Sequence, residues 1–198
     1  MKDITKAEMN IVLTLVKSPE VDYNANNIAK KVGITAMGAL KILKRLEKED
    51  IVISKKMGNA SFYQINFTND YAVQYVKLLI KREVAQAEAY VRVWISDIKK
   101  LKSADAAILF GSVLTKGNKA NDIDVVLITD QQRFEKLKKE IDELAILSQK
   151  RIHPVFQAMV DVERNIKKKD PVILNAIKGI VAFGEDIVLK TLNDTRGK

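Results

Sequence analysis

Residues 107–128 read Ala-Ile-Leu-Phe-Gly-Ser-Val-Leu-Thr-Lys-Gly-Asn-Lys-Ala-Asn-Asp-Ile-Asp-Val-Val-Leu-Ile, two apolar runs separated by a polar loop. The first run ends at Phe110, where Gly111 and Ser112 begin the loop. Both runs have the length and the β-branched or aromatic content of buried strands. This part of the sequence therefore predicts two core strands joined by a loop that begins with glycine and serine.

Two aspartates, Asp122 and Asp124, open the second apolar run. Because strand side chains alternate between faces, both carboxylates lie on one face, and Ile123 and Val125 point to the other. Two carboxylates held this close repel each other unless a cation lies between them or one is protonated. Oxygen ligands of this kind favour Mg²⁺ or Mn²⁺, so we expect a metal site here.

The glycine and serine that begin the loop suit phosphate binding. Gly111 lets the backbone approach a ligand closely, and Ser112 can offer a hydroxyl or an N–H to a phosphate. A Gly-Ser pair followed at this spacing by Asp-x-Asp at the head of a strand resembles the signature of the DNA polymerase beta-type nucleotidyltransferase superfamily, in its minimal prokaryotic form. Gly117 also matches the second glycine that is frequent in that family.

The resemblance implies a fold and an activity for the C-terminal part of the chain. Gly111 and Ser112 would hold the triphosphate of an NTP, and Asp122 and Asp124 would bind the metal ions that assist nucleotidyl transfer. Two such ions can stabilise both the attacking and the leaving oxygen.

One feature of active superfamily members is missing from the sequence. They usually carry a third carboxylate on a later strand, but the strand expected at residues 151–156 has none and offers only His153. Asp161 and Glu163 follow it, on the next expected helix. Because the third acid acts as a base or completes the metal shell, its absence bears more on catalysis than on nucleotide binding.

Composition limits the alternatives. The 198 residues can form one medium domain or two small ones, and they include no cysteine and one histidine, which excludes disulfides, thiolate sites and multi-histidine metal sites. No apolar run reaches the roughly 18 residues of a membrane span, so we expect a soluble, cytoplasmic protein. The net charge of +9, which leans towards the N-terminal half, favours a polyanionic partner. A cysteine-free chain rich in lysine and glutamate is typical of heat-adapted prokaryotes.

The N-terminal segment carries signals for successive helices. The expected capping residues are Thr5 for the first helix, Asn24 or Asn26 for the second and Thr35 for the third. Glu8 would complete a capping box with the first of these, and Gly33 would end the second helix. The buried stripe of the third helix would be Ala39, Leu43 and Leu46. Helix, glycine-containing turn and helix form a helix-turn-helix arrangement.

Two β-rich runs at residues 51–53 and 61–67 then flank a basic tip with a Gly-Asn pair, which predicts a hairpin. Residues 4–68 resemble the winged-helix DNA-binding domains of bacterial and archaeal transcriptional regulators, most clearly at residues 34–52. Asp50 stands where that family usually has glycine, and aspartate tolerates the left-handed conformation better than most residues.

The winged-helix resemblance implies that the exposed face of the third helix enters the major groove of double-stranded DNA. The expected contacts are Thr35, Ala36, Met37 and Leu40 near base edges, Lys41, Lys44 and Arg45 near phosphates, and Lys55 and Lys56 on the wing. Because phosphate contacts carry no sequence information and the base-facing residues are small or apolar, strong sequence specificity is not predicted. Two alternatives are an ordinary solvated helix face and a protein-docking module.

Residues 71–101 contain neither proline nor glycine, and their apolar residues recur at helical spacing. They predict a connecting helix, either continuous or broken near residues 81–83. Helices of this length join domains or pair with a copy of themselves, so a homodimer through this helix is one expectation.

Further elements follow the aspartate strand. Residues 134–147 predict an amphipathic helix, and 151–156 a strand that Pro154 limits to a sheet edge or a bulge. Asp170 and Pro171 begin a short helix. Residues 180–183 predict a last strand, followed by a tail that is frayed from residue 195.

These signals predict an α+β protein with a winged helix-turn-helix domain at residues 1–68, a connecting helix at 69–100 and a nucleotidyltransferase-fold mixed sheet with flanking helices at 101–198. The expected function is DNA binding by a protein whose second domain transfers NMP from Mg-NTP to a hydroxyl acceptor. The alternative is a transcriptional regulator whose nucleotidyltransferase fold is inactive and senses a nucleotide or dimerises. A third hypothesis is an antitoxin-like or scaffold protein in which both domains bind protein.

Overall fold

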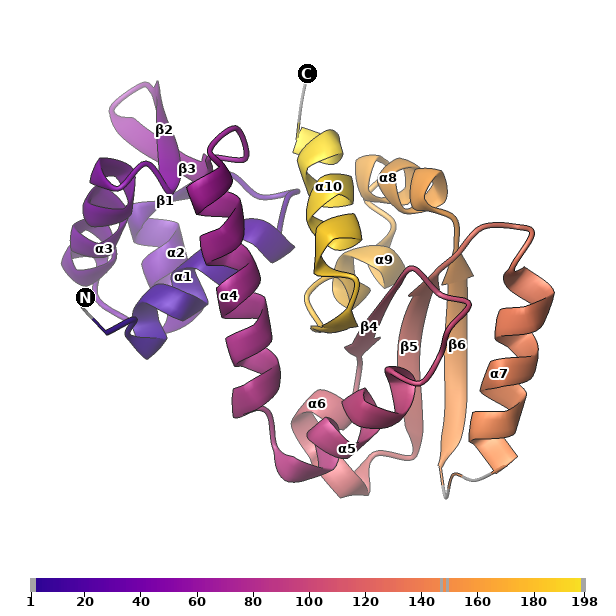
Figure 1. Ribbon diagram of the computed structural model, residues 1–198. Coiled ribbons are helices and arrows are strands. Elements are labelled where there is room, and N and C mark those ends of the chain that lie inside the picture. Colours follow the sequence, from indigo (N-terminus) through magenta and orange to yellow (C-terminus); the bar gives the residue numbers. More distant parts are fainter. Residues whose placement is uncertain (1–2, 147, 149, 197–198) are drawn as a thin grey trace. The chain divides into compact units, whose positions relative to one another are not determined.

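The computed structural model describes residues 3–146, 148 and 150–196 (Figure 1). The chain forms two compact units, Met1–Leu79 and Ile80–Lys198, and the division falls within helix α4 (Asp70–Gln86). Each unit has its own sheet, so the protein is α+β with a winged-helix-like N-terminal region and a mixed four-stranded C-terminal sheet. Among the described residues, no helix is long and apolar enough to cross a membrane.

The helices of the first unit begin where the sequence predicted. They are α1 (Lys6–Lys17), α2 (Ala25–Val32), α3 (Ala36–Lys48) and the first part of α4. The Thr35 side chain accepts a hydrogen bond from the Gly38 N–H, and Asn24 forms a capping box at the start of α2. Gly33 turns the chain between α2 and α3 with φ +74°. The predicted helix-turn-helix is confirmed, including its fully buried stripe of Ala39, Leu43 and Leu46.

A small antiparallel sheet completes this unit. It consists of β1 (Tyr23–Asn24), β2 (Val52–Met57) and β3 (Ala60–Ile65), in the order β1-β3-β2. The hairpin of β2 and β3 confirms the predicted wing, whereas β1 is too short to give a sequence signal. Asp50, at the end of α3, has φ +57°, as its tolerance of the left-handed region allows. Its carboxylate accepts hydrogen bonds of 2.9 Å from the side-chain amides of Asn66 and Asn69.

The prediction of a capping box at α1 is half wrong. Thr5 accepts a hydrogen bond from the Glu8 N–H at 3.2 Å, as expected. The Glu8 carboxylate does not return to the helix terminus but accepts a hydrogen bond from the Tyr75 hydroxyl of α4 at 2.6 Å. A partner from a distant segment therefore replaces the local one.

The sheet of the second unit contains β4 (Ala106–Phe110), β5 (Asp122–Ile128), β6 (Arg151–Gln157) and β7 (Ile180–Phe183). The strand order is β6-β5-β4-β7, with β5 and β6 parallel and the other pairs antiparallel. Both core strands predicted from the opening segment are present and buried. As Pro154 predicted, β6 lies at an edge of the sheet.

Helices cover this sheet. They are α5 (Ala89–Ile98), α6 (Val113–Lys116), the 3₁₀ turn η1 (Gly117–Lys119), α7 (Phe134–Ile146), α8 (Met159–Lys167), α9 (Pro171–Ala176) and α10 (Glu185–Arg196). Figure 1 shows α7 running beside β6, against which it packs. The core between α5, α7 and the sheet includes Trp94, Ile95, Leu109, Val125 and Leu137.

Some expectations for this half of the chain need correction. The connecting segment is two helices, α4 and α5, and the break falls at Ala87 and Glu88 rather than near residues 81–83. The polar loop after Ser112 folds into the short helical turns α6 and η1. The expected C-terminal tail is α10, which buries Val188, Leu189 and Leu192 at helical spacing. Leu147, Gly197 and Lys198, the ends of two predicted segments, lie outside the described residues.

Candidate functional site

The strand topology of the second unit brings the predicted metal ligands to one edge of the sheet. Strand β5 begins at Asp122, and its parallel neighbour β6 begins at the same edge. In the register of the sheet, Asp124 lies between Phe110 of β4 and His153 of β6. Because Gly111 directly follows Phe110, the phosphate-binding candidate also reaches this edge.

Asp122, Asp124 and His153 form a compact cluster. One potential ligand atom from each residue lies within 4.8 Å of the other two. His153 Nδ1 is 3.4 Å from Asp122 Oδ2 and 3.6 Å from Asp124 Oδ1. All three side chains are partly exposed, whereas Ile123, which points to the opposite face, is fully buried. The cluster is therefore held by a rigid strand pair and open to a ligand from solvent.

The electrostatics of the cluster favour a cation. Partial burial, and then the neighbouring charge of Asp122, raise the pKa of Asp124 above its ordinary value, although His153 acts in the opposite direction. Both causes disfavour the negative charge of Asp124, and a cation bound between the two carboxylates would stabilise that charge. Two carboxylates and one imidazole could hold a divalent ion, and a mixed oxygen and nitrogen donor set suits Mn²⁺ and later transition metals better than an all-oxygen set.

Gly111 is packed against the cluster. Its φ is +78°, and a Cβ at this position would come within 2.2 Å of Asp124 Oδ2. Only glycine allows the loop to pass this close to the carboxylate. Ser112 follows, partly exposed, and its carbonyl accepts a hydrogen bond of 2.8 Å from the Lys116 N–H, which fixes the turn of α6. Loop and carboxylates thus form one surface.

The third position of the cluster is a histidine. Asp161 and Glu163 lie on α8, outside the cluster, and Asp161 forms an ion pair with Arg164. Among the described residues, no third carboxylate joins the cluster. The sequence identified His153 but did not place it, because its position depends on which strand pairs with β5 and in what register.

Within the described part of the chain, the predicted DNA-contacting residues of the first unit fall into two groups, those that are free on the surface and those that pair with carboxylates. Thr35, Ala36 and Met37, at the start of α3, are exposed, and the Met37 side chain is 61% exposed. Leu40 is half-buried. Lys41 on α3 and Lys55 and Lys56 on the wing are exposed, and within the described residues none of these lysines is recorded in an ion pair.

Lys44 and Arg45, by contrast, have carboxylate partners of their own. Lys44 Nζ donates a hydrogen bond to Glu47 Oε2 at 2.8 Å, and this bond, together with Tyr63, raises the pKa of Lys44. The Arg45 guanidinium forms an ion pair with the buried Glu8 and lies 3.8 Å from Glu49. Among the predicted contacts that the structure describes, the positive charge on α3 and the wing that is not paired with a carboxylate therefore comes from Lys41, Lys55 and Lys56.

Comparisons with known proteins give distant structural similarities only. No protein-family model and no curated protein matches the chain. The structure of the PcaV transcriptional regulator from Streptomyces coelicolor is similar with 16% identity, over 48% of this chain and 72% of that one, at a TM-score of 0.35. The adhesin competence repressor AdcR from Streptococcus pyogenes is similar with 12% identity, over 72% and 81%, at 0.37.

MepR, a transcription regulator of the Staphylococcus aureus multidrug efflux pump MepA, is similar with 16% identity, over 50% of this chain and 77% of that one, at a TM-score of 0.35. The chain thus has distant structural similarity to transcriptional regulators. Similarity at this level does not assign a function to it.

Proposed function

We propose that the protein is a DNA-binding transcription regulator that reads DNA with α3 and the wing of its N-terminal unit. The observation that carries the proposal is the exposed, uncompensated lysine set on these elements: Lys41, Lys55 and Lys56. Strand β2 follows α3 in the chain and also contacts it, so the helix and the wing belong to the same compact unit.

The chemistry of this surface suits phosphate contacts better than base recognition. Lysine side chains bind phosphate as flexible point charges and supply affinity without sequence information. Met37 and Ala36, at the exposed start of α3, can make apolar contacts such as those with thymine methyl groups. We therefore expect salt-dependent binding to duplex DNA with modest sequence preference.

The experiment compares two double variants of the full chain. Lys55→Gln/Lys56→Gln removes the wing charges, and Lys138→Gln/Lys139→Gln removes two exposed lysines of α7 as a matched control with the same net charge. Fluorescence anisotropy with a labelled duplex is measured across a salt series. The wing variant should reduce the slope of log affinity against log salt by about 2, at about 0.9 per phosphate contact, and the control should leave it unchanged. Equal effects of the two variants would contradict a wing-specific role.

We propose in addition that the C-terminal unit has a nucleotidyltransferase-like fold and binds a divalent metal ion with a nucleoside triphosphate. This second function is favoured by the convergence of Asp122, Asp124, His153 and Gly111 at one sheet edge. The two aspartates and the histidine would hold the metal, and Gly111 and Ser112 would contact the phosphates. A bound divalent ion would neutralise the negative charge of a triphosphate next to the carboxylates.

Nucleotide sensing fits this cluster better than nucleotidyl transfer. Transfer by a two-metal mechanism requires enough negative charge to hold both metal ions. Within the described residues, the cluster offers two carboxylates and one imidazole, which is one negative charge fewer than three acids. We therefore propose that the unit reports nucleotide to the DNA-binding unit, and that it is catalytically weak or inactive.

The test is a calorimetric titration of the full chain with each of the four NTPs, in Mg²⁺, in Mn²⁺ and in EDTA. Metal-dependent binding should disappear in Asp122→Asn/Asp124→Asn and persist in Asp161→Asn, which removes a carboxylate outside the cluster. A parallel assay with α-labelled NTP looks for label transfer. Label transfer abolished by Asp124→Asn would establish an enzyme instead of a sensor. Binding that persists in the double variant would exclude the cluster.

A further inference from the structure

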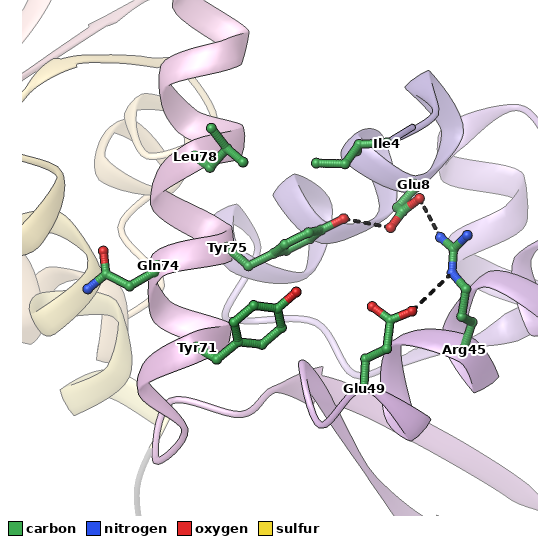
Figure 2. Close-up of a pocket in the computed structure, with 8 residues that line it drawn as sticks. All are labelled: Ile4, Glu8, Arg45, Glu49, Tyr71, Gln74, Tyr75 and Leu78. Carbon is green, nitrogen blue, oxygen red and sulfur yellow. Dashed lines mark hydrogen bonds and ion pairs between the residues drawn. The ribbon is translucent and has the colours of Figure 1, made fainter. Parts of the chain in front are cut away.

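The first unit contains a pocket between α1, α3 and α4 that the proposed functions do not use. Its volume is about 420 Å³. Figure 2 shows its lining residues: Ile4, Glu8, Arg45, Glu49, Tyr71, Gln74, Tyr75 and Leu78. A pocket of this size with mostly apolar walls and a few convergent polar groups is typical of a small-molecule site.

A buried polar network forms one wall. The Glu8 side chain is 5% exposed, pairs with Arg45 of α3 and accepts the hydrogen bond from the Tyr75 hydroxyl. Burial, and then this hydrogen bond, raise the pKa of the Tyr75 hydroxyl, so it stays a neutral donor. The network links three helices and uses the positive charge of Arg45 to compensate Glu8.

Among its described lining residues, the pocket contains a second carboxylate, that of Glu49, and no second positive charge to pair with it. Glu49 lies 3.8 Å from Arg45 Nε, and its side chain is 45% exposed. Two carboxylates and one guanidinium line the pocket, so its walls carry one net negative charge although the whole chain carries +9. In Figure 2, Glu49 and the Tyr71 ring both point toward the open space between α3 and α4.

The opposite wall is apolar and aromatic. Tyr71 and Leu78 of α4 are 58% and 53% exposed, so both side chains are accessible to a ligand. The rings of Tyr71 and Tyr75 have centroids 6.4 Å apart and are tilted by 40°, and both residues line the pocket. Tyrosine faces attract cations through their quadrupole.

We infer that this pocket binds a hydrophobic organic cation, with its apolar body against Tyr71 and Leu78 and its positive charge near Glu49. Charge complementarity excludes an anion as the preferred ligand, because Arg45 is already shared between two carboxylates. Arg45 lies in the last turn of α3 and Glu49 is the C-cap of that helix, so a ligand here contacts the end of the helix that we propose reads DNA. That regulatory consequence rests on the proposed function, whereas binding itself does not.

The test uses two probes of the same shape and opposite charge, tetraphenylphosphonium and tetraphenylborate. Each is titrated into the full chain by isothermal calorimetry, without DNA. The net charge of the protein alone would favour the borate anion. Saturable binding of the phosphonium cation, tighter than that of the borate, is therefore the expected result. Tighter binding of the borate, or no saturable binding of the cation, would overturn the inference.

Variants locate the site. Glu49→Gln should weaken phosphonium binding by about fivefold, as expected for a partly exposed charge, and Tyr71→Ala by about tenfold. Both residues are exposed, so both variants should fold. Glu143→Gln, which removes an exposed carboxylate of α7, should bind as the unchanged protein does. If Tyr71→Ala instead dissociates a dimer in sedimentation and no variant alters cation binding, a second copy covers the pocket and the inference is wrong. Since no DNA is present, failure here leaves the proposed DNA binding to its own test.

Discussion

Substituting Gly111 by alanine tests whether the loop and the aspartates form one site. An L-residue at φ +78° costs about 1–2 kcal/mol in backbone strain relative to glycine. The new Cβ would also lie 2.2 Å from Asp124 Oδ2 and 3.1 Å from Asp124 Cγ. Since the obstructing atoms are the end of a side chain that can rotate, the unit should fold, with its melting temperature lowered by about 4–8 °C.

Metal binding at the proposed site should be weakened more than the fold. To avoid the methyl group, the Asp124 carboxylate must leave its position beside His153 and Asp122. Losing one oriented donor should weaken Mn²⁺ binding by about 10–100-fold, measured from the free Mn²⁺ signal in electron paramagnetic resonance. Gly33→Ala is the matched control, because φ is +74° there and a Cβ would meet nothing within 4 Å. Gly33→Ala should show the strain cost and unchanged Mn²⁺ affinity. A Gly111→Ala variant that binds Mn²⁺ like the unchanged protein would refute the proposed single site.

Further predictions concern stability. Because burial and Asp122 raise the pKa of Asp124 above its ordinary 3.8, the folded state binds the proton more tightly than the unfolded state, and stability falls as pH rises through this window. Asp124→Asn should therefore raise the melting temperature in EDTA at pH 7, and the gain should vanish below pH 3.8. Asp50→Ala should destabilise by about 2 kcal/mol in urea titrations, and Asp50→Gly by about 1 kcal/mol less, because glycine relieves the strain and both lose the hydrogen bonds. Glu140 is partly buried, but hydrogen bonds from the Ser103 side chain and from the N–H groups of Ser103 and Lys102 lower the pKa of its carboxyl below 4.5. Glu140→Gln should cost about 1–2 kcal/mol at pH 7, and the difference from the unchanged protein should shrink as pH falls through the lowered pKa.

Elements with strong local signals were predictable from the sequence. The caps Thr5, Asn24 and Thr35 each bind amides within three residues, so their function needs no distant partner. The core strands followed from apolar runs of strand length, and Pro154 placed its strand at an edge because proline lacks the N–H that a second neighbour would require. The hairpin likewise followed from a local turn signal.

Features that depend on distant partners were not predictable. Glu8 fitted a capping box locally, but its carboxylate binds Tyr75, 67 residues away in the chain. The break between α4 and α5 falls at Ala87 and Glu88, both good helix formers, so local propensity gave no warning. There, Val84 and Ala87 pack against the core of the second unit, and that packing outweighs continuity of the helix. The candidate pocket also depends on distant partners, because Glu8 and Tyr75, which form the long-range hydrogen bond, both line it.

The histidine in the aspartate cluster changes the question that the sequence raised. The resemblance to the superfamily, whose active members usually carry a third carboxylate on a later strand, pointed to β6 as the strand that would supply it. The register instead places His153 beside Asp124, where its imidazole adds a nitrogen donor and no negative charge. Such a cluster can hold a divalent ion, yet its two negative charges neutralise less of the positive charge of two metal ions, which a two-metal transfer requires, than three acids would. A histidine in place of the third acid therefore favours Mn²⁺ over Mg²⁺ and, in the function that we propose, nucleotide binding over nucleotidyl transfer.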